Sequence, residues 1–253
     1  MNSNIKNNKL SFQAGLTPLI KKEVSSVNPT CIEQTIKRQF GTECDFQNNR
    51  TLAAGMLYAL NLLREASEKF RLPFNIAPPN VNVFKTMELL KQEPVKFGFC
   101  IGEKEKVIKK HPEFEVRSIF IKNIPDNIES WNKQVEEWYA KHIVSSDNIL
   151  APFLHELLHN IHLHRIFEQS PQFGLTNAIY MANTSFSHQQ NRIIADKIGT
   201  YAKTSKMELY SETLAKMIAD SLDETGLKLA SNPLDRLAEF PKFVREFIES
   251  QLN

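Results

Sequence analysis

The chain carries a motif of the form His-Glu-x-x-His, made by His155, Glu156 and His159. It lies in an apolar stretch that holds four of the seven histidines, Phe153-Leu-His-Glu-Leu-Leu-His-Asn-Ile-His-Leu-His-Arg165. Histidines four residues apart on a helix share one face, so both imidazoles can reach a single ion. Glu156 lies at the edge of that face, where it can act as a base toward water without binding the metal. The motif therefore predicts a zinc site with His155 and His159 as ligands.

Two further histidines follow the motif. His162 lies seven residues after His155, on nearly the same face, and is a candidate to support a ligand or to replace one. His164 points away from that face. The longer metzincin pattern requires Gly and His at positions occupied here by His162 and Arg165, so that class is excluded. For both histidines the simpler interpretation is a satisfied polar or surface residue.

A catalytic zinc has three protein ligands, so a third is expected elsewhere in the chain. Glu208 and Glu212 lie one turn apart on one predicted helix face, where one can bind the ion and the other can support a histidine. Ser205-x-x-Glu208 also fits a capping box, in which Glu208 returns to the start of its own helix; with Thr204 as the cap, Glu208 is free. Spacing alone leaves the two glutamates equivalent.

The two motifs together resemble those of the gluzincin metallopeptidases that include the anthrax lethal factor catalytic domain and the Pro-Pro endopeptidases. Their second motif reads roughly Tyr-x-x-Thr-Asn-x-x-Glu-Phe-Phe-Ala-Glu, and this chain reads Tyr-Ala-Lys-Thr-Ser-Lys-Met-Glu-Leu-Tyr-Ser-Glu over residues 201–212. The resemblance covers about residues 50–225. It implies that Glu208 is the third ligand, that the Tyr201 hydroxyl faces the reacting carbonyl and that Glu156 is the base. Glu212 is then left to support a histidine.

The resemblance implies one zinc ion, a peptide or protein substrate, and peptide-bond hydrolysis. In this scheme Glu156 takes a proton from a zinc-bound water, and Tyr201 donates a hydrogen bond to the oxyanion. Substrates of such enzymes commonly lie along an edge strand, for which Val116–Ile121 is the candidate, although an interior strand fits it equally well. The alternatives are an inactive zinc-binding or interaction module on the same fold, and a structural protein in which the motif is incidental.

The surrounding pattern predicts an α+β, zincin-like fold with a small mixed sheet and the motif helix in an N-terminal lobe, and a mainly helical C-terminal lobe. Residues 1–48, poor in apolar residues, are expected to form a loosely packed extension. Residues 49–253 are expected to form the metallopeptidase domain, with lobes of about 49–160 and 161–253. The predicted strands are Val81–Phe84, Phe97–Ile101 and Val116–Ile121; the predicted helices are Pro29–Phe40, one starting at Thr51, Trp131–His142, Ile149–Phe167, 189–202, 205–222 and 240–252.

Composition narrows the classes of function. The formal charge is +2, from 31 basic and 29 acidic residues, which argues against a nucleic-acid binder. No apolar run approaches the length of a membrane span, and the N-terminus lacks the apolar region of a secretory signal. Three widely spaced cysteines favour a reducing compartment. We therefore expect a cytoplasmic protein, or one exported without a conventional signal peptide, with no membrane partner and an oligomeric state that the sequence leaves open.

Overall fold

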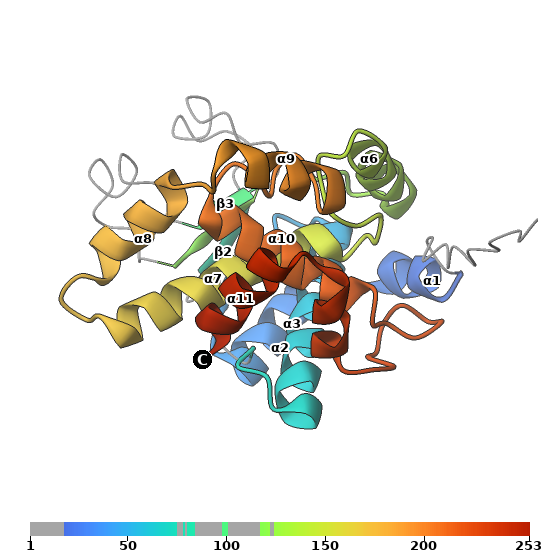
Figure 1. Cartoon of the computed structure of the whole chain (residues 1–253). Helices are drawn as coiled ribbons and strands as arrows, with labels where there is room; N and C mark the ends of the chain where they lie inside the picture. The colour runs from blue at the N-terminus through green and yellow to red at the C-terminus, as the bar shows by residue number, and fades with distance from the viewer. Residues whose placement is uncertain (1–17, 75–77, 79, 84–97, 101–116, 122–123) are drawn as a thin grey trace, which may run out of the picture.

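The structure, a computed structural model, describes residues 18–74, 78, 80–83, 98–100, 117–121 and 124–253. It is mostly helical with one small sheet, which confirms the α+β class (Figure 1). Its elements, in chain order, are α1 (Pro18–Ser26), α2 (Pro29–Phe40), β1 (Glu43–Asp45), α3 (Arg50–Phe70), β2 (Asn80–Val83), β3 (Gly98–Cys100), β4 (Ile119–Ile121), α6 (Ile128–Ala140), α7 (Ala151–Gln169), α8 (Gly174–Asn183), α9 (His188–Lys197), α10 (Lys206–Ala219), the 3₁₀ helix η2 (Pro233–Glu239) and α11 (Lys242–Leu252).

The sheet has the strand order β1-β2-β4-β3. Strands β1, β2 and β4 run parallel, and β3 pairs antiparallel with β4, so the sheet is mixed as predicted. The prediction of Val116–Ile121 as an edge strand is wrong, because β4 lies between β2 and β3. Its Ile119, Phe120 and Ile121 are all fully buried, as expected of a strand covered on both faces. The predicted strand residues Arg117 and Ser118 precede β4 and are not part of a strand. The remaining predicted positions, Phe84, Phe97, Ile101 and Val116, lie outside the described residues.

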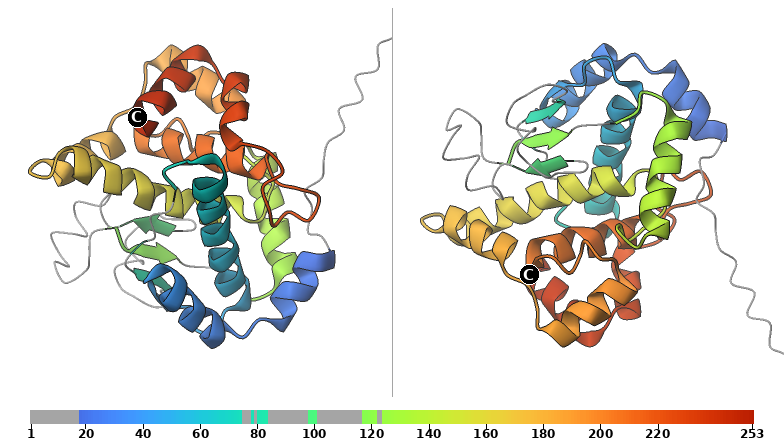
Figure 2. Two further views of the ribbon diagram at one scale, coloured as in Figure 1. Left: turned by 90° about the horizontal axis from the view of Figure 1, so that it is seen from below. Right: turned by 90° about the horizontal axis from the view of Figure 1, so that it is seen from above.

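Helix α7 crosses the middle of the molecule. It runs between the sheet and α3 on one side and α10 and α11 on the other (Figure 2). Every residue from Ala151 to Leu163 is buried, which agrees with a sequence that is apolar nearly all round. Among the described residues, no helix is both long and apolar enough to cross a membrane.

The first part of the chain is better packed than its composition suggested. Residues 18–48 form α1, α2 and β1, and β1 pairs with β2 inside the sheet. Ile36 and Phe46 have no exposed surface, and the Phe46 N–H donates to Glu33 Oε1 at 2.8 Å. The expectation of a loosely packed extension is therefore wrong for residues 18–48, because the few apolar side chains there are placed where they enter the core. Residues 1–17 lie outside the described residues.

Two predicted helix boundaries matter for the site. The helix predicted over 189–202 ends at Lys197, so Tyr201 lies in a turn rather than on a helix. The helix predicted over 205–222 is α10, and Ser205 is its N-cap, with its hydroxyl accepting a hydrogen bond from the Glu208 N–H at 3.1 Å. Helices α8 and α1 and the 3₁₀ helix η2 were not predicted.

Candidate metal centre

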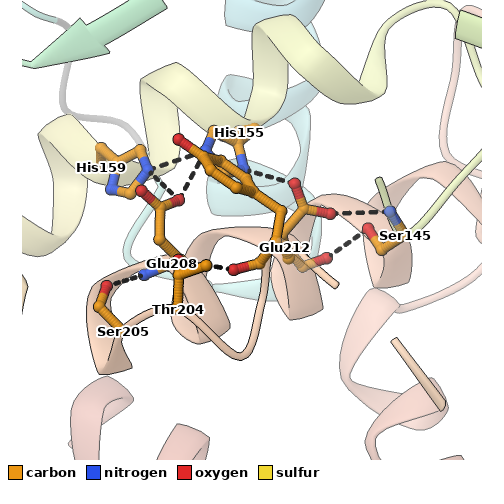
Figure 3. A network of polar contacts seen from close by, with 8 residues as sticks. Ser145, His155, His159, Thr204, Ser205, Glu208 and Glu212 are labelled. Carbon is orange, nitrogen blue, oxygen red and sulfur yellow. Dashed lines mark hydrogen bonds and ion pairs between the residues drawn. The ribbon is translucent and has the colours of Figure 1, made fainter. Parts of the chain in front are cut away.

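Two helices bring three potential metal ligands together. His155 and His159 come from α7, Glu208 comes from the first turn of α10, and α7 and α10 pack closely against each other (Figure 3). The two Nε2 atoms lie 2.8 Å apart, and Glu208 Oε2 lies 3.1 Å from His155 Nε2 and 3.2 Å from His159 Nε2. In the described part of the chain, these three residues form the group that can hold a metal ion.

The donor set fits zinc. Two imidazoles and one carboxylate are zinc ligands, and donor atoms about 2.0–2.1 Å from one ion at a tetrahedral angle lie about 3.3 Å apart. The observed separations of 2.8–3.2 Å require only small movements to reach that value. Three lone-pair atoms directed at one another in a buried place would repel without a cation between them, and a proton or a metal dication can fill that role. The arrangement of the three residues can therefore hold a metal ion.

The position of Glu208 resolves the ambiguity at the start of α10. Ser205 is the cap, which by the sequence argument would have turned Glu208 back onto its own helix. Only half of the capping box forms: the Ser205 hydroxyl accepts from the Glu208 N–H, while the Glu208 carboxylate extends to the two histidines. Histidine contacts outweigh burial and hold the pKa of Glu208 well below its ordinary value, so the carboxylate is charged.

Glu212, one turn further along α10, supports His155 from behind. Its Oε1 accepts from His155 Nδ1 at 2.9 Å, which leaves Nε2 facing the other two ligands. Its Oε2 accepts from the backbone N–H of Ser145 at 2.8 Å, and the Ser145 hydroxyl donates to the Glu212 carbonyl at 2.9 Å. Burial lowers the pKa of His155, but the hydrogen bonds to Glu208 and Glu212 outweigh it and raise that pKa well above its ordinary value.

Glu156 and Tyr201 occupy different surroundings. Glu156, between the two histidines on α7, is 3% exposed and does not belong to the group of three ligands. Tyr201 is 39% exposed, and its ring centroid lies 5.7 Å from that of His155. Glu156 is thus a buried carboxylate next to His155 in the helix, and Tyr201 is a solvent-accessible phenol whose ring lies near that of His155.

His162 has the simpler of the two roles considered in the sequence, that of a buried polar residue with its own partners. Its Nε2 lies 2.9 Å from Gln251 Oε1 on α11, and its ring stacks on Tyr210 of α10 at a centroid distance of 4.1 Å. We call His162, Tyr210 and Gln251 the His162 cluster. Burial lowers the pKa of His162 to about 4, so this histidine is neutral. It packs α7 against α10 and α11, and its two contacts are with Gln251 and Tyr210 rather than with the three candidate ligands.

His164 lies on the far side of α7, as its place in the helix predicted. Its Nδ1 is 3.0 Å from Arg117 Nη1, and its Nε2 is 3.0 Å from Glu168 Oε1. Because a guanidinium only donates, His164 accepts at Nδ1 and carries its proton on Nε2. Its contacts thus tie α7 to the residues just before β4.

No sequence pattern pointed to Ser145 as part of the site. It lies in the polar run Ser145-Ser-Asp-Asn148, which has the composition of a surface loop, yet Ser145 is only 3% exposed. Its contact with Glu212 joins residues 67 positions apart, so no local pattern could have revealed it.

Comparisons of this chain with protein-family models, with curated proteins and with solved structures found no match. A functional assignment therefore depends on the geometry and chemistry of the site itself.

Proposed function

We propose that this chain is a zinc-dependent endopeptidase with a zincin-like fold. The observation that carries the proposal is the convergence of His155 Nε2, His159 Nε2 and a Glu208 carboxylate oxygen in one buried place. Three protein ligands, rather than four, are the usual set of a catalytic zinc, because the fourth position is needed for water or substrate. A buried glutamate on the same helix and an accessible tyrosine beside His155 supply the remaining groups that hydrolysis needs.

In this proposal each residue of the site has a separate role. His155, His159 and Glu208 would hold the ion, which would supply Lewis acidity toward a water molecule and the scissile carbonyl. Glu156 accepts a proton from the attacking water and returns it to the leaving amine. Tyr201 donates a hydrogen bond to the carbonyl oxygen as negative charge develops on it. Glu212 keeps the His155 proton on Nδ1, so that Nε2 remains a ligand.

The sheet supports a path for the substrate. Strand β3 ends the described sheet, runs antiparallel to β4 and packs against α7, the helix that carries the two histidines. An extended peptide can add to such an edge through backbone hydrogen bonds. We propose that the substrate backbone binds along β3, in place of the strand that the sequence suggested.

The test combines metal content with cleavage. Purified protein should contain about one zinc ion per chain and should cut an unstructured peptide mixture, and a chelator should abolish the cleavage until zinc is restored. One zinc without any cleavage would instead support the inactive zinc-binding module. Absence of zinc binding would overturn both proposals.

A further inference from the structure

A short segment after α6 contacts two parts of the metal centre at once. We call residues His142, Ile143, Val144 and Ser145 the bracket segment. It follows the end of α6, and His142 adopts a left-handed conformation with φ 51°, which turns the chain sharply toward α10. The segment ends a few residues before α7 begins and contains none of the proposed ligands.

The first end of the bracket segment holds the turn that carries Tyr201. The His142 carbonyl accepts from the Thr200 N–H at 2.6 Å and from the Thr200 hydroxyl at 2.8 Å. The Ile143 carbonyl accepts from the Tyr201 N–H at 3.2 Å. Gly199 allows this approach, because a Cβ at that position would lie only 3.3 Å from the Ile143 carbonyl oxygen. The backbone of Tyr201 is therefore fixed by the bracket segment.

The second end holds the residue that orients His155. Ser145 donates twice to Glu212, from its N–H to the carboxylate and from its hydroxyl to the backbone carbonyl. The other oxygen of the same carboxylate accepts from His155 Nδ1 (Figure 3). A continuous line of hydrogen bonds thus runs from Ser145 through Glu212 to a ligating imidazole. Such partners behind a ligand set its tautomer and ring orientation.

We propose that the bracket segment is a positioning element that keeps the ligand His155 and the hydroxyl donor Tyr201 in register with each other. Ser145 is the positioning residue for His155, acting through Glu212, and Thr200 is the positioning residue for Tyr201. This inference rests on the proposed function. It adds that one segment, outside both motifs, sets metal affinity at one end and turnover at the other.

The first experiment replaces Ser145 with alanine and measures zinc affinity by competition with a chelator. Ser145→Ala removes the hydroxyl that donates to the Glu212 backbone carbonyl and keeps the N–H that donates to its carboxylate. Zinc binding should therefore weaken by up to about tenfold, the upper size of one lost hydrogen bond. The matched control is Ser221→Ala. Ser221 is buried like Ser145, and its hydroxyl also donates to a backbone carbonyl, that of Met217 near the end of α10, at 2.7 Å. The control should lose a similar amount of thermal stability and keep its zinc affinity.

The second experiment replaces Thr200 with valine, which has nearly the same shape but no hydroxyl. Thr200→Val should lower kcat about fivefold, the usual size of one lost hydrogen bond, while zinc affinity stays within twofold. The control is Thr35→Val, because the Thr35 hydroxyl makes an equally exposed 2.8 Å bond to the Cys31 carbonyl, far from α10 in sequence. The control should change neither quantity.

The outcomes separate this inference from the proposed function. If the parent binds zinc but Ser145→Ala binds it as tightly as Ser221→Ala does, the bracket segment does not position His155. If Thr200→Val and Thr35→Val have equal kcat, it does not position Tyr201. A parent that binds zinc and cleaves nothing overturns the proposed function while the zinc-affinity comparison still decides the role of Ser145. A parent that binds no zinc overturns both.

Discussion

Helices α7 and α10 together build two buried histidine sites that behave in opposite ways. At the metal centre His155 meets the carboxylates of Glu208 and Glu212, and its pKa is raised well above the ordinary value. In the His162 cluster, two turns further along α7, the partners are an amide and a phenol ring, and the pKa of His162 falls to about 4. Both rings are buried, so burial does not distinguish them.

The difference between the sites lies in the charge of their partners. Burial favours a neutral imidazole at His162. The hydrogen bond to the uncharged Gln251 acts against burial but does not outweigh it, and the nearby Arg165 acts in the same direction as burial. At His155 two carboxylates reverse the effect. A buried histidine becomes part of a cation site only when the opposite helix supplies anionic oxygens. Five changes would break or sharpen this contrast.

The largest effect is expected from removing the carboxylate that both ligating histidines share. Glu208→Ala should lower zinc affinity by more than about a hundredfold and abolish cleavage, because two imidazoles alone do not complete the site. Equilibrium dialysis against zinc measures this directly. Glu168→Ala removes another carboxylate that pairs with a histidine of α7, the half-buried His164, and should leave zinc binding intact. Equal affinities in the two variants would show that Glu208 is not a ligand.

Glu156 is expected to affect the rate without affecting the metal. Glu156→Gln keeps the size of the side chain but cannot accept the proton, so kcat should fall by about 10²–10⁴-fold. Zinc content should stay at one ion per chain, because Glu156 is outside the ligand group. The measurement is steady-state cleavage of a peptide substrate together with metal analysis. Cleavage at the parental rate would contradict the role of Glu156 as the base.

Glu212 should have an intermediate effect through His155. Glu212→Gln replaces an anionic acceptor with an amide that has to satisfy both His155 Nδ1 and the Ser145 N–H, and the amide NH₂ cannot accept from either. We expect zinc affinity to fall about 10–100-fold. Chelator competition gives the value, and Glu224→Gln, on the loop after α10, is a control from the same part of the sequence. An unchanged affinity would mean that Glu212 does not orient the ligand.

His162 should make the protein less stable in mild acid. Its pKa is about 4 in the folded state and 6.5 in an unperturbed chain, so between these values the unfolded state binds the proton more tightly. The contribution of His162 to the free energy of unfolding is therefore fully present above about pH 6.5. It falls by up to about 3 kcal/mol as the pH falls toward 4. Denaturant unfolding across this range measures the slope. His162→Phe keeps a ring against Tyr210 but cannot bind a proton, so it should reduce the slope of stability against pH. An unchanged slope would contradict the low pKa of His162.

The smallest effect is expected from placing a carboxylate in the His162 cluster, where the candidate metal centre has Glu208 and Glu212. Gln251→Glu places a carboxylate at the partner of His162 Nε2, which should raise the pKa of His162 by about one unit and reduce the acid-dependent loss of stability by about 1.4 kcal/mol. The imidazole titration followed by NMR gives the pKa. A pKa that stays near 4 would show that burial, rather than the charge of the partner, controls this histidine.

The local pattern of apolar residues was sufficient to predict several of the helices and strands around the site. Helix α2 has the predicted bounds, and α7 begins and ends within two residues of its prediction, because the apolar side chains follow the helical repeat over several turns. Strands β3 and β4 also fall inside their predicted ranges, and β2 begins one residue before its predicted start at Val81. The burial of residues 18–48 was missed because average hydrophobicity does not show that Ile36 and Phe46 both point into the core.

The sequence by itself determined that His155 and His159 share a helix face, because the helical repeat places residues four apart side by side. It also determined that Glu208 and Glu212 share one. Only the tertiary structure decided that Glu208 reaches both histidines while Glu212 supports His155, that Ser145 supports Glu212, and that β4 lies between β2 and β3. These outcomes depend on how α7, α10 and the sheet pack, and contacts between residues tens of positions apart leave no periodic trace in the chain.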